Sequence, residues 1–251
     1  MRGYGGKDGC RIMEGMPELA ALHWSGGKDS MLALHQVISF RKYEVRYLLT
    51  SLNETSGSVS IHGVSGELLS EQVKQLDMTL HEVRMPEIPG MAFYEQKMEE
   101  HIDGLQKEGI TCHIFGDIFL EDLRRYREQL FNRAGVEVFF PLWKQNGRKL
   151  IREFVDLGYQ AIIVAAREDL KDLCGRIIDH EFITELPDGV DPCGENGEFH
   201  TFVFDGPLFQ SKVAFETGEL IFKTFPESTH NHPERISGYW YIDLKKSIRP
   251  L

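Results

Sequence analysis

The stretch LAALHWSGGKDS at residues 19–30 decides the fold of this chain. Its first half, residues 19–24, is a short apolar run, and the polar stretch 25–30 interrupts that run abruptly. After the interruption, Met31, Leu34 and Ile38 recur at helical spacing. The pattern predicts a strand, a tight loop and a helix.

The alternation of strand and helix continues beyond this stretch. Strand-like runs occupy 43–52, 79–86, 111–117 and 159–166, and helical patterns begin near residues 65, 91, 120 and 148. Sustained alternation of this kind implies a parallel sheet with helices on both faces and right-handed crossovers. We therefore expect the α/β class, with an open, doubly wound parallel sheet.

The pattern changes toward the C-terminus. Residues 187–198 are rich in turn formers, and two strand-like runs joined near Gly206 and Pro207 follow them. These runs are more typical of antiparallel strands than of a βαβ unit. We expect a flexible leader at 1–17, a first domain at 18–140 and a smaller C-terminal α+β domain at 141–251.

The composition excludes several function classes. The chain carries 28 Lys and Arg against 39 Asp and Glu, a formal charge of -11, so we expect no nucleic-acid partner. No apolar run approaches the roughly 20 residues that a bilayer span requires, so we expect no membrane insertion. The 4 cysteines include no C-x-x-C pair, which fits a reducing, cytoplasmic setting.

The loop at 25–30 has the chemistry of a phosphate site. Its two glycines allow backbone N–H groups to face inward, and the following helix N-terminus adds unpaired donors and partial positive charge. Two serine hydroxyls add donors, Lys28 adds a positive charge, and Asp29 can position a magnesium ion. The residues that we predict to bind phosphate are Ser25, Gly26, Gly27, Lys28, Asp29 and Ser30.

The spacing fits neither a Walker A loop nor a G-x-G-x-x-G dinucleotide turn. It matches the pattern S-G-G-x-D-S, and the loop resembles the pyrophosphate loop, or PP-loop, of the N-type ATP pyrophosphatases. This resemblance implies a sheet like that of the adenine nucleotide alpha hydrolases, with ATP and Mg²⁺ as cofactors. A second GGKD string at residues 5–8 has no preceding strand, so we assign it no role.

Three further features narrow the resemblance to the family that includes diphthine–ammonia ligase. They are Gly116-Asp117-Ile118, Pro141-Leu142-Trp143, and the late segment 194–201 with its continuation at 205–208. The resemblance covers about residues 18 to 220. It implies that ATP activates a carboxylate, in the ligases the diphthine of elongation factor 2, as an adenylate that ammonia then attacks.

The late segment departs from the diphthine ligases at two positions. Those enzymes usually have Glu-Gly-Gly-Glu-Phe/Tyr-Glu-Thr/Ser, whereas this chain has Asn196 and His200 at the second and sixth positions. The pattern is more similar to bacterial relatives whose owners make no diphthamide. The carboxylate, a small molecule or diphthine, therefore stays open, as does the nitrogen donor.

The remaining site candidates follow from position. Gly116 and Asp117 stand at the end of a strand, where open parallel sheets place ligands, so we expect them to bind the nucleotide. Glu195, Glu198 and His200 lie in a glycine-flanked turn that leads into a strand, a common way to present catalytic groups. The predicted catalytic set is Lys28, Asp29, Glu195, Glu198 and His200, with Asp29 as the metal ligand.

Other polar residues receive weaker roles. Arg124, Arg125, Arg127 and Arg133 have glutamates at helical spacing, which favours a solvated ion-pair face over phosphate binding. His62 could face the active site or be a loop residue. His230 and His232 have metal-like spacing but no visible third ligand, which favours a surface loop.

The function favoured by these observations is that of an ATP-dependent ligase that adenylates a carboxylate, releases pyrophosphate and amidates with ammonia or an amine. A PP-loop sulfurtransferase acting on tRNA is the enzymatic alternative, and a non-catalytic adenine-nucleotide-sensing module is the other. A homodimer is compatible with the sequence.

Overall fold

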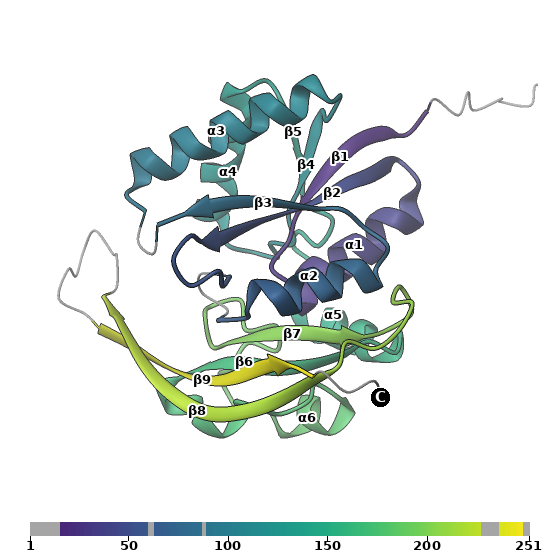
Figure 1. The fold of residues 1–251 in the computed structure, drawn as a ribbon. Helices are drawn as coiled ribbons and strands as arrows, with labels where there is room; N and C mark the ends of the chain where they lie inside the picture. Colours follow the sequence, from purple (N-terminus) through teal and green to yellow (C-terminus); the bar gives the residue numbers. More distant parts are fainter. Residues whose placement is uncertain (1–15, 60–62, 87–88, 227–235, 248–251) are drawn as a thin grey trace, which may run out of the picture.

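The computed structural model describes residues 16–59, 63–86, 89–226 and 236–247 (Figure 1). The GGKD string at 5–8, His62, His230 and His232 lie outside the described residues, and so does most of the expected leader.

The first part of the chain alternates strands and helices. Its elements are β1 (Glu18–His23), α1 (Lys28–Phe40), β2 (Tyr43–Asn53), α2 (Gly66–Gln75), β3 (Leu80–Met85), α3 (Met91–Lys107), β4 (Cys112–Ile114), α4 (Glu121–Arg133) and β5 (Glu137–Phe139). The five strands form one parallel sheet in the order β3-β2-β1-β4-β5. The strand order reverses between β1 and β4, because β2 and β4 lie on opposite sides of β1.

Helices cover both faces of this sheet (Figure 1). Apolar residues of α1 and α2, such as Met31, Leu34 and Leu69, belong to a core that continues into the second part of the chain. On the opposite face, α3 and α4 bury Met98, Ile102 and Leu130 against the sheet. The predicted open, doubly wound parallel sheet is confirmed, but the strand-like run at 159–166, which continued the alternation in the sequence, is not part of it and pairs antiparallel instead.

The second part is built on an antiparallel sheet. Its elements are α5 (Gly147–Asp156), β6 (Gln160–Arg167), the 3-10 helix η1 (Glu168–Leu173), α6 (His180–Glu185), β7 (Phe199–Asp205), β8 (Phe215–Pro226) and β9 (Ile236–Lys246). The strand order is β7-β6-β9-β8. The predicted α+β character of the C-terminal part is confirmed, although β7 and β8 are not neighbours, because β6 and β9 lie between them.

The two parts share one hydrophobic core. It unites Leu22 and Met31 of the first part with Phe154, Ile163 and Val203 of the second. The chain leaves the parallel sheet after β5, at Phe139, and enters the antiparallel sheet at Gln160. The predicted boundary at 140/141 stays a prediction. In the described ranges, no helix is both long enough and apolar enough to cross a membrane.

Candidate functional site

The loop between β1 and α1 has a backbone that requires glycine. Gly26 has a positive φ of 77°, and a Cβ at this position would lie 2.7 Å from the Leu69 Cδ1 atom. Gly116, after β4, approaches the loop so closely that a Cβ there would lie 3.0 Å from the backbone carbon and oxygen of Asp29. The loop can therefore pack between α2 and the end of β4 only with these two glycines.

Hydrogen bonds within the loop and to β7 fix the shape of the loop. The Gly27 N–H donates to Ser25 Oγ at 3.2 Å, and the Ser30 hydroxyl donates to the Gly27 carbonyl at 2.9 Å. The Lys28 N–H donates to the Thr201 hydroxyl of β7 at 3.0 Å. The helix N-terminus predicted to bind phosphate is thus in direct contact with the antiparallel sheet.

The loop forms one wall of a cavity of about 370 Å³. This cavity lies beyond the carboxyl ends of β1 and β4, where the strand order reverses, the place at which open α/β sheets bind ligands. Its polar lining residues include Ser25, Lys28, Asp29, Asp117, Glu195 and His200. Its less polar lining residues include Trp24, Leu49, Tyr94, Phe115, Leu120 and Leu123. The cavity therefore offers charged and polar groups suited to phosphate together with apolar and aromatic groups suited to a flat group such as a base.

Lys28 is almost fully buried at 4% exposure, and its charge is paired. Its Nζ atom donates to Asp29 Oδ2 at 2.8 Å and to the Cys193 carbonyl oxygen. Burial acts to lower the Lys28 pKa, but the neighbouring Asp29, with smaller contributions from Cys193 and Glu195, outweighs it, and the pKa is raised. Lys28 therefore stays protonated and supplies a fixed positive charge to the cavity.

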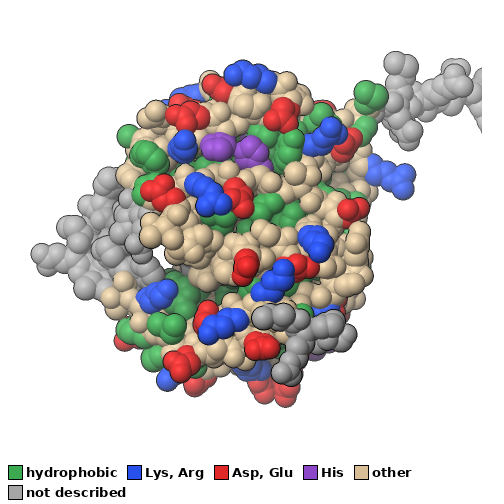
Figure 2. Space-filling view, viewed as in Figure 1, with side chains coloured by type: hydrophobic (Ala, Val, Ile, Leu, Met, Phe, Trp, Pro, Cys, Tyr) green, Lys and Arg blue, Asp and Glu red, His purple; other side chains and the backbone are tan. Residues whose placement is uncertain are grey.

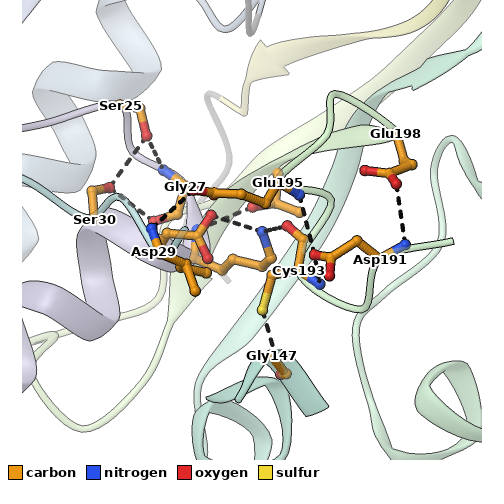
Figure 3. A network of polar contacts seen from close by, with 12 residues as sticks. Ser25, Gly27, Asp29, Ser30, Gly147, Asp191, Cys193, Glu195 and Glu198 are labelled. Carbon is orange, nitrogen blue, oxygen red and sulfur yellow. Dashed lines mark hydrogen bonds and ion pairs between the residues drawn. The ribbon is translucent and has the colours of Figure 1, made fainter. Parts of the chain in front are cut away.

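Glu195 lies in the late turn, the segment of residues 191–198 before β7. Its side chain reaches the end of β4. Its Oε1 atom accepts a hydrogen bond from the Ile118 N–H at 2.8 Å. Burial, together with the nearby Asp29 and Asp117 carboxylates, raises the pKa of Glu195 to about 7. Figure 3 shows Glu195 and Asp29 side by side, with the late turn facing the loop. A carboxyl group with this pKa can accept or donate a proton near neutral pH.

Glu198 is also buried, but its carboxylate organises the late turn. It accepts hydrogen bonds from the Asp191 N–H at 3.1 Å and the Asn196 N–H at 3.0 Å (Figure 3). Asp191 in turn accepts from the Cys193 N–H at 2.9 Å and the Glu195 N–H at 3.2 Å. The contacts of Glu198 therefore favour a role in positioning Glu195 rather than direct contact with a reacting group.

His200 lines the cavity from β7. Burial, followed by the charge of Lys28, lowers its pKa to about 4. The imidazole is therefore neutral at pH 7, and it contributes polarity to the cavity without adding charge. Its ring lies 6.3 Å, centroid to centroid, from that of Tyr239.

The prediction that the arginines of α4 form a solvated face is wrong for Arg127. Its Nη2 atom donates to Asp117 Oδ1 at 3.1 Å, and its guanidinium lies 4.2 Å from the centre of the Phe115 ring. Both Arg127 and Asp117 line the cavity. The prediction holds for Arg125, which pairs with Asp122 at the surface. Helical spacing identified partners on the same helix but could not identify Asp117, which follows β4.

Gln72 of α2 is a further site residue, which sequence reasoning missed. Its side chain is fully buried, and its Nε2 atom donates to the carbonyls of Gly26 at 2.8 Å and Val203 at 2.6 Å. Its Oε1 atom accepts from the Trp24 indole N–H at 2.9 Å. Gln72 thus connects β1, the loop and β7. The only signal in the sequence was a polar residue beside the apolar stripe of α2.

Replacing Gln72 by leucine should lower the melting temperature by several degrees. Each buried polar group left without a partner costs about 1–3 kcal/mol, and 1 kcal/mol corresponds to roughly 2–4 °C at this chain length. Gln75→Leu on the same helix is the control, because Gln75 is only half-buried and bonds to Glu71. Equal melting temperatures for both variants, measured by calorimetry, would contradict the connecting role of Gln72.

The raised pKa of Glu195 predicts a specific pH dependence of stability. Between the ordinary glutamate pKa of 4.5 and about 7, the folded chain keeps a proton at Glu195 that the unfolded chain has lost. Rising pH across this interval therefore reduces the contribution of Glu195 to stability. Glu195→Gln should gain stability relative to wild type as pH rises from about 5 to about 8, measured by urea unfolding without nucleotide.

The surface variant Glu121→Gln is the control for this measurement, because Glu121 pairs with Lys144 at the surface and its pKa is lowered, not raised. If the stability difference between Glu195→Gln and wild type is the same at both pH values, Glu195 does not titrate in this interval.

The donor groups fit a magnesium ion held mainly by phosphate. No cluster of three or more His, Cys, Asp or Glu side chains suited to a metal occurs within the described ranges. Asp29 lies at the loop with 31% of its side chain exposed. Mg²⁺ is commonly bound by one or two carboxylates together with substrate phosphates and water. Asp29 is thus a suitable single carboxylate ligand.

A glycine-rich loop at the switch point of an open parallel sheet is typical of nucleotide-binding α/β proteins. Comparison with known families gives a more specific answer. The sequence model of the diphthamide synthase N-terminal domain matches residues 18–138, and that of the diphthamide synthase C-terminal domain matches residues 146–232. The chain belongs to the PP-loop ATP pyrophosphatase family. Within this family, its two parts match the two domains of the diphthamide synthases.

Curated relatives support this placement. The chain is similar to diphthine–ammonia ligase of Homo sapiens, with 30% identity over 133 residues, which is 50% of this chain and 46% of the relative. The enzyme of Rattus norvegicus is 33% identical over 124 residues, 46% of each chain. That of Schizosaccharomyces pombe is 25% identical over 222 residues, 78% of this chain and 36% of the relative. This chain thus spans half or less of the length of these relatives.

Proposed function

We propose that this protein is an ATP-dependent ligase that adenylates a carboxylate, releases pyrophosphate and transfers ammonia or an amine to the activated carbonyl. The observation that carries the proposal is the meeting of two segments in one cavity. The loop at 25–30 supplies phosphate-binding groups, the turn before β7 supplies Glu195, and β7 itself supplies His200. The relatives named diphthine–ammonia ligase support this reaction class.

The loop is suited to hold the pyrophosphate that leaves. The N-terminus of α1 directs partial positive charge into the cavity, and the buried, protonated Lys28 adds a full charge. A bound Mg²⁺ would neutralise further phosphate charge, with Asp29 as its protein ligand. Of the other predicted binding residues, Ser25, Gly27 and Ser30 line the cavity, and Gly26 lets the loop turn.

The turn that carries Glu195 is suited to the amide-forming step. Attack by ammonia requires that its nitrogen carry a free electron pair and later lose a proton. Glu195, whose pKa is raised to about 7, is the group that we assign to accept that proton. Glu198 fixes the turn that carries Glu195, as its hydrogen bonds indicate. Gly116 and Asp117 also line the cavity, and Arg127 pairs with Asp117.

The thiol chemistry of the described residues argues against a sulfurtransferase. Burial raises the pKa of Cys112 to about 12 and that of Cys174 to about 11, and it also raises the pKa of Cys193. Nucleophilic sulfur requires the thiolate, which such pKa values disfavour. Among these three, only Cys193 lines the cavity, and its thiol lies 3.4 Å from the Gly147 carbonyl.

The spent nucleotide tests the reaction class. We expect AMP and pyrophosphate when the protein is incubated with ATP, magnesium, ammonium and a panel of carboxylates that includes diphthine on elongation factor 2. Chromatography of the nucleotide gives the readout, with each carboxylate omitted in turn as the control. ADP as the product would refute adenylation, and ATP that stays intact with every carboxylate would favour a nucleotide sensor.

A further inference from the structure

Strand β8 forms an open edge of the antiparallel sheet. It pairs with β9 on one side, and in the described part of the chain no strand pairs with its other side. Residues 216–224 are all exposed. Three consecutive apolar residues in this stretch are exposed by about two fifths: Leu220 at 42%, Ile221 at 44% and Phe222 at 39%. Figure 1 shows β8 as the outermost strand of the lower sheet.

A long apolar edge of this kind is a template for pairing with another strand. Natural proteins usually interrupt such edges with bulges, charges or proline, or keep them short. β8 contains 12 residues, and its bulge lies between Thr217 and Leu220. From Leu220 onward it pairs with β9 in regular register, so an undistorted apolar stretch remains available. A partner strand would bury this stretch and satisfy its outward backbone groups.

The sequence of β8 is complementary to itself. In an antiparallel pair of two identical strands with the two-fold axis at Ile221, each Leu220 faces a Phe222, and each Glu219 faces a Lys223. Glu219 lies within the bulge, directly before the apolar stretch, and Lys223 follows that stretch. A shift of the axis by one residue in either direction places Lys223 opposite Thr217 or Ile221 and removes both ion pairs. One register alone therefore matches charge with charge and apolar with apolar.

We propose that the occupant of this edge is a second copy of the chain, bound through β8 about a two-fold axis at Ile221. Such a contact is isologous and closes after two subunits. It joins the two four-stranded sheets into one continuous sheet. β7, which carries His200 and Thr201 into the cavity, is three strands away, or about 14 Å at the usual strand spacing. The dimer therefore leaves the cavity open, and the proposal does not depend on the proposed reaction.

Reversal of the two charges tests both the contact and its register. We expect the wild-type chain to sediment as a dimer in analytical ultracentrifugation over a micromolar concentration series. Glu219→Lys and Lys223→Glu should each weaken the dimer by roughly 5- to 30-fold, because each places like charges opposite one another twice. An equimolar mixture of the two single variants should restore the dimer, since in the mixed pair both positions again carry opposite charges.

Glu216→Lys is the control, because it makes the same charge change on the same strand but faces no charge in the proposed pairing. Ile221→Lys should give a monomer whose melting temperature shows that it is folded. A wild-type monomer at every concentration would overturn the proposal. So would a dimer that tolerates Ile221→Lys, or two weakened single variants that do not recover when mixed. Dimerisation through a different surface would appear as a dimer that tolerates Ile221→Lys. Binding of another protein to β8 in place of a second copy would appear as a wild-type monomer.

Discussion

Replacement of Lys28 by methionine should reduce the rate of AMP formation by roughly 10- to 150-fold, which corresponds to the 1.5–3 kcal/mol of a hydrogen bond to a charged group. Methionine keeps most of the buried aliphatic volume and removes the ammonium group. The partner Asp29 is partly exposed, so water can solvate its carboxylate after the substitution. We therefore expect the variant to fold, as circular dichroism can verify.

Lys7→Met provides a matched control, because Lys7 lies in the same four-residue string, GGKD, within residues 5–8. That string has no preceding strand in the sequence pattern, so its lysine should not affect turnover. Full activity of the Lys28 variant, or sensitivity at Lys7 instead, would show that the loop at 25–30 is not the phosphate site. The comparison separates a general effect of lost lysine charge from the specific effect of position.

The features predicted correctly from the sequence were those set by local pattern. Residues 19–38 combine an apolar strand, two glycines and a helical stripe, so the position of the segment 25–30 at the end of β1 and the start of α1 could be derived from neighbouring positions alone. The alternation that predicted the parallel sheet is equally local. The same reasoning could not order the antiparallel strands, because β9 pairs with β6, which is distant in the sequence, as well as with its sequence neighbour β8.

The features that sequence reasoning missed depend on contacts between distant segments. In the sequence, Gln72 is one more polar residue on an amphipathic helix. In the structure, β7 and the loop pack against it and its side chain is fully buried. In the sequence, Arg127 has glutamates of its own helix as the expected ion-pair partners. In the structure, its partner is Asp117, which follows β4. In both residues a long side chain carries several donors, which reach backbone or carboxylate groups that no helical spacing can indicate.

The second large effect is expected at His200, where this chain departs from the diphthine ligases. His200→Glu exchanges a neutral imidazole for a carboxyl group on the cavity wall, near enough to Lys28 that the lysine charge contributes to the lowered pKa of the histidine. If this position selects the acyl substrate, the variant should form AMP in the presence of diphthine on elongation factor 2 about 10- to 150-fold faster than wild type.

Asn196→Gly removes the other departure and serves as the control. Asn196 is exposed, and its side chain makes a 3.2 Å hydrogen bond to Glu198, so we expect a change of only a few fold in the same assay. If His200→Glu gives no faster AMP formation, calorimetry of ATP binding distinguishes two reasons: either substrate choice lies elsewhere, or His200 belongs to the nucleotide site. Unchanged ATP affinity without activity on diphthine would show that substrate choice lies elsewhere in the cavity. Lost ATP affinity in a folded variant would place His200 in the nucleotide site, because its neighbour Thr201 accepts a hydrogen bond from the loop at Lys28.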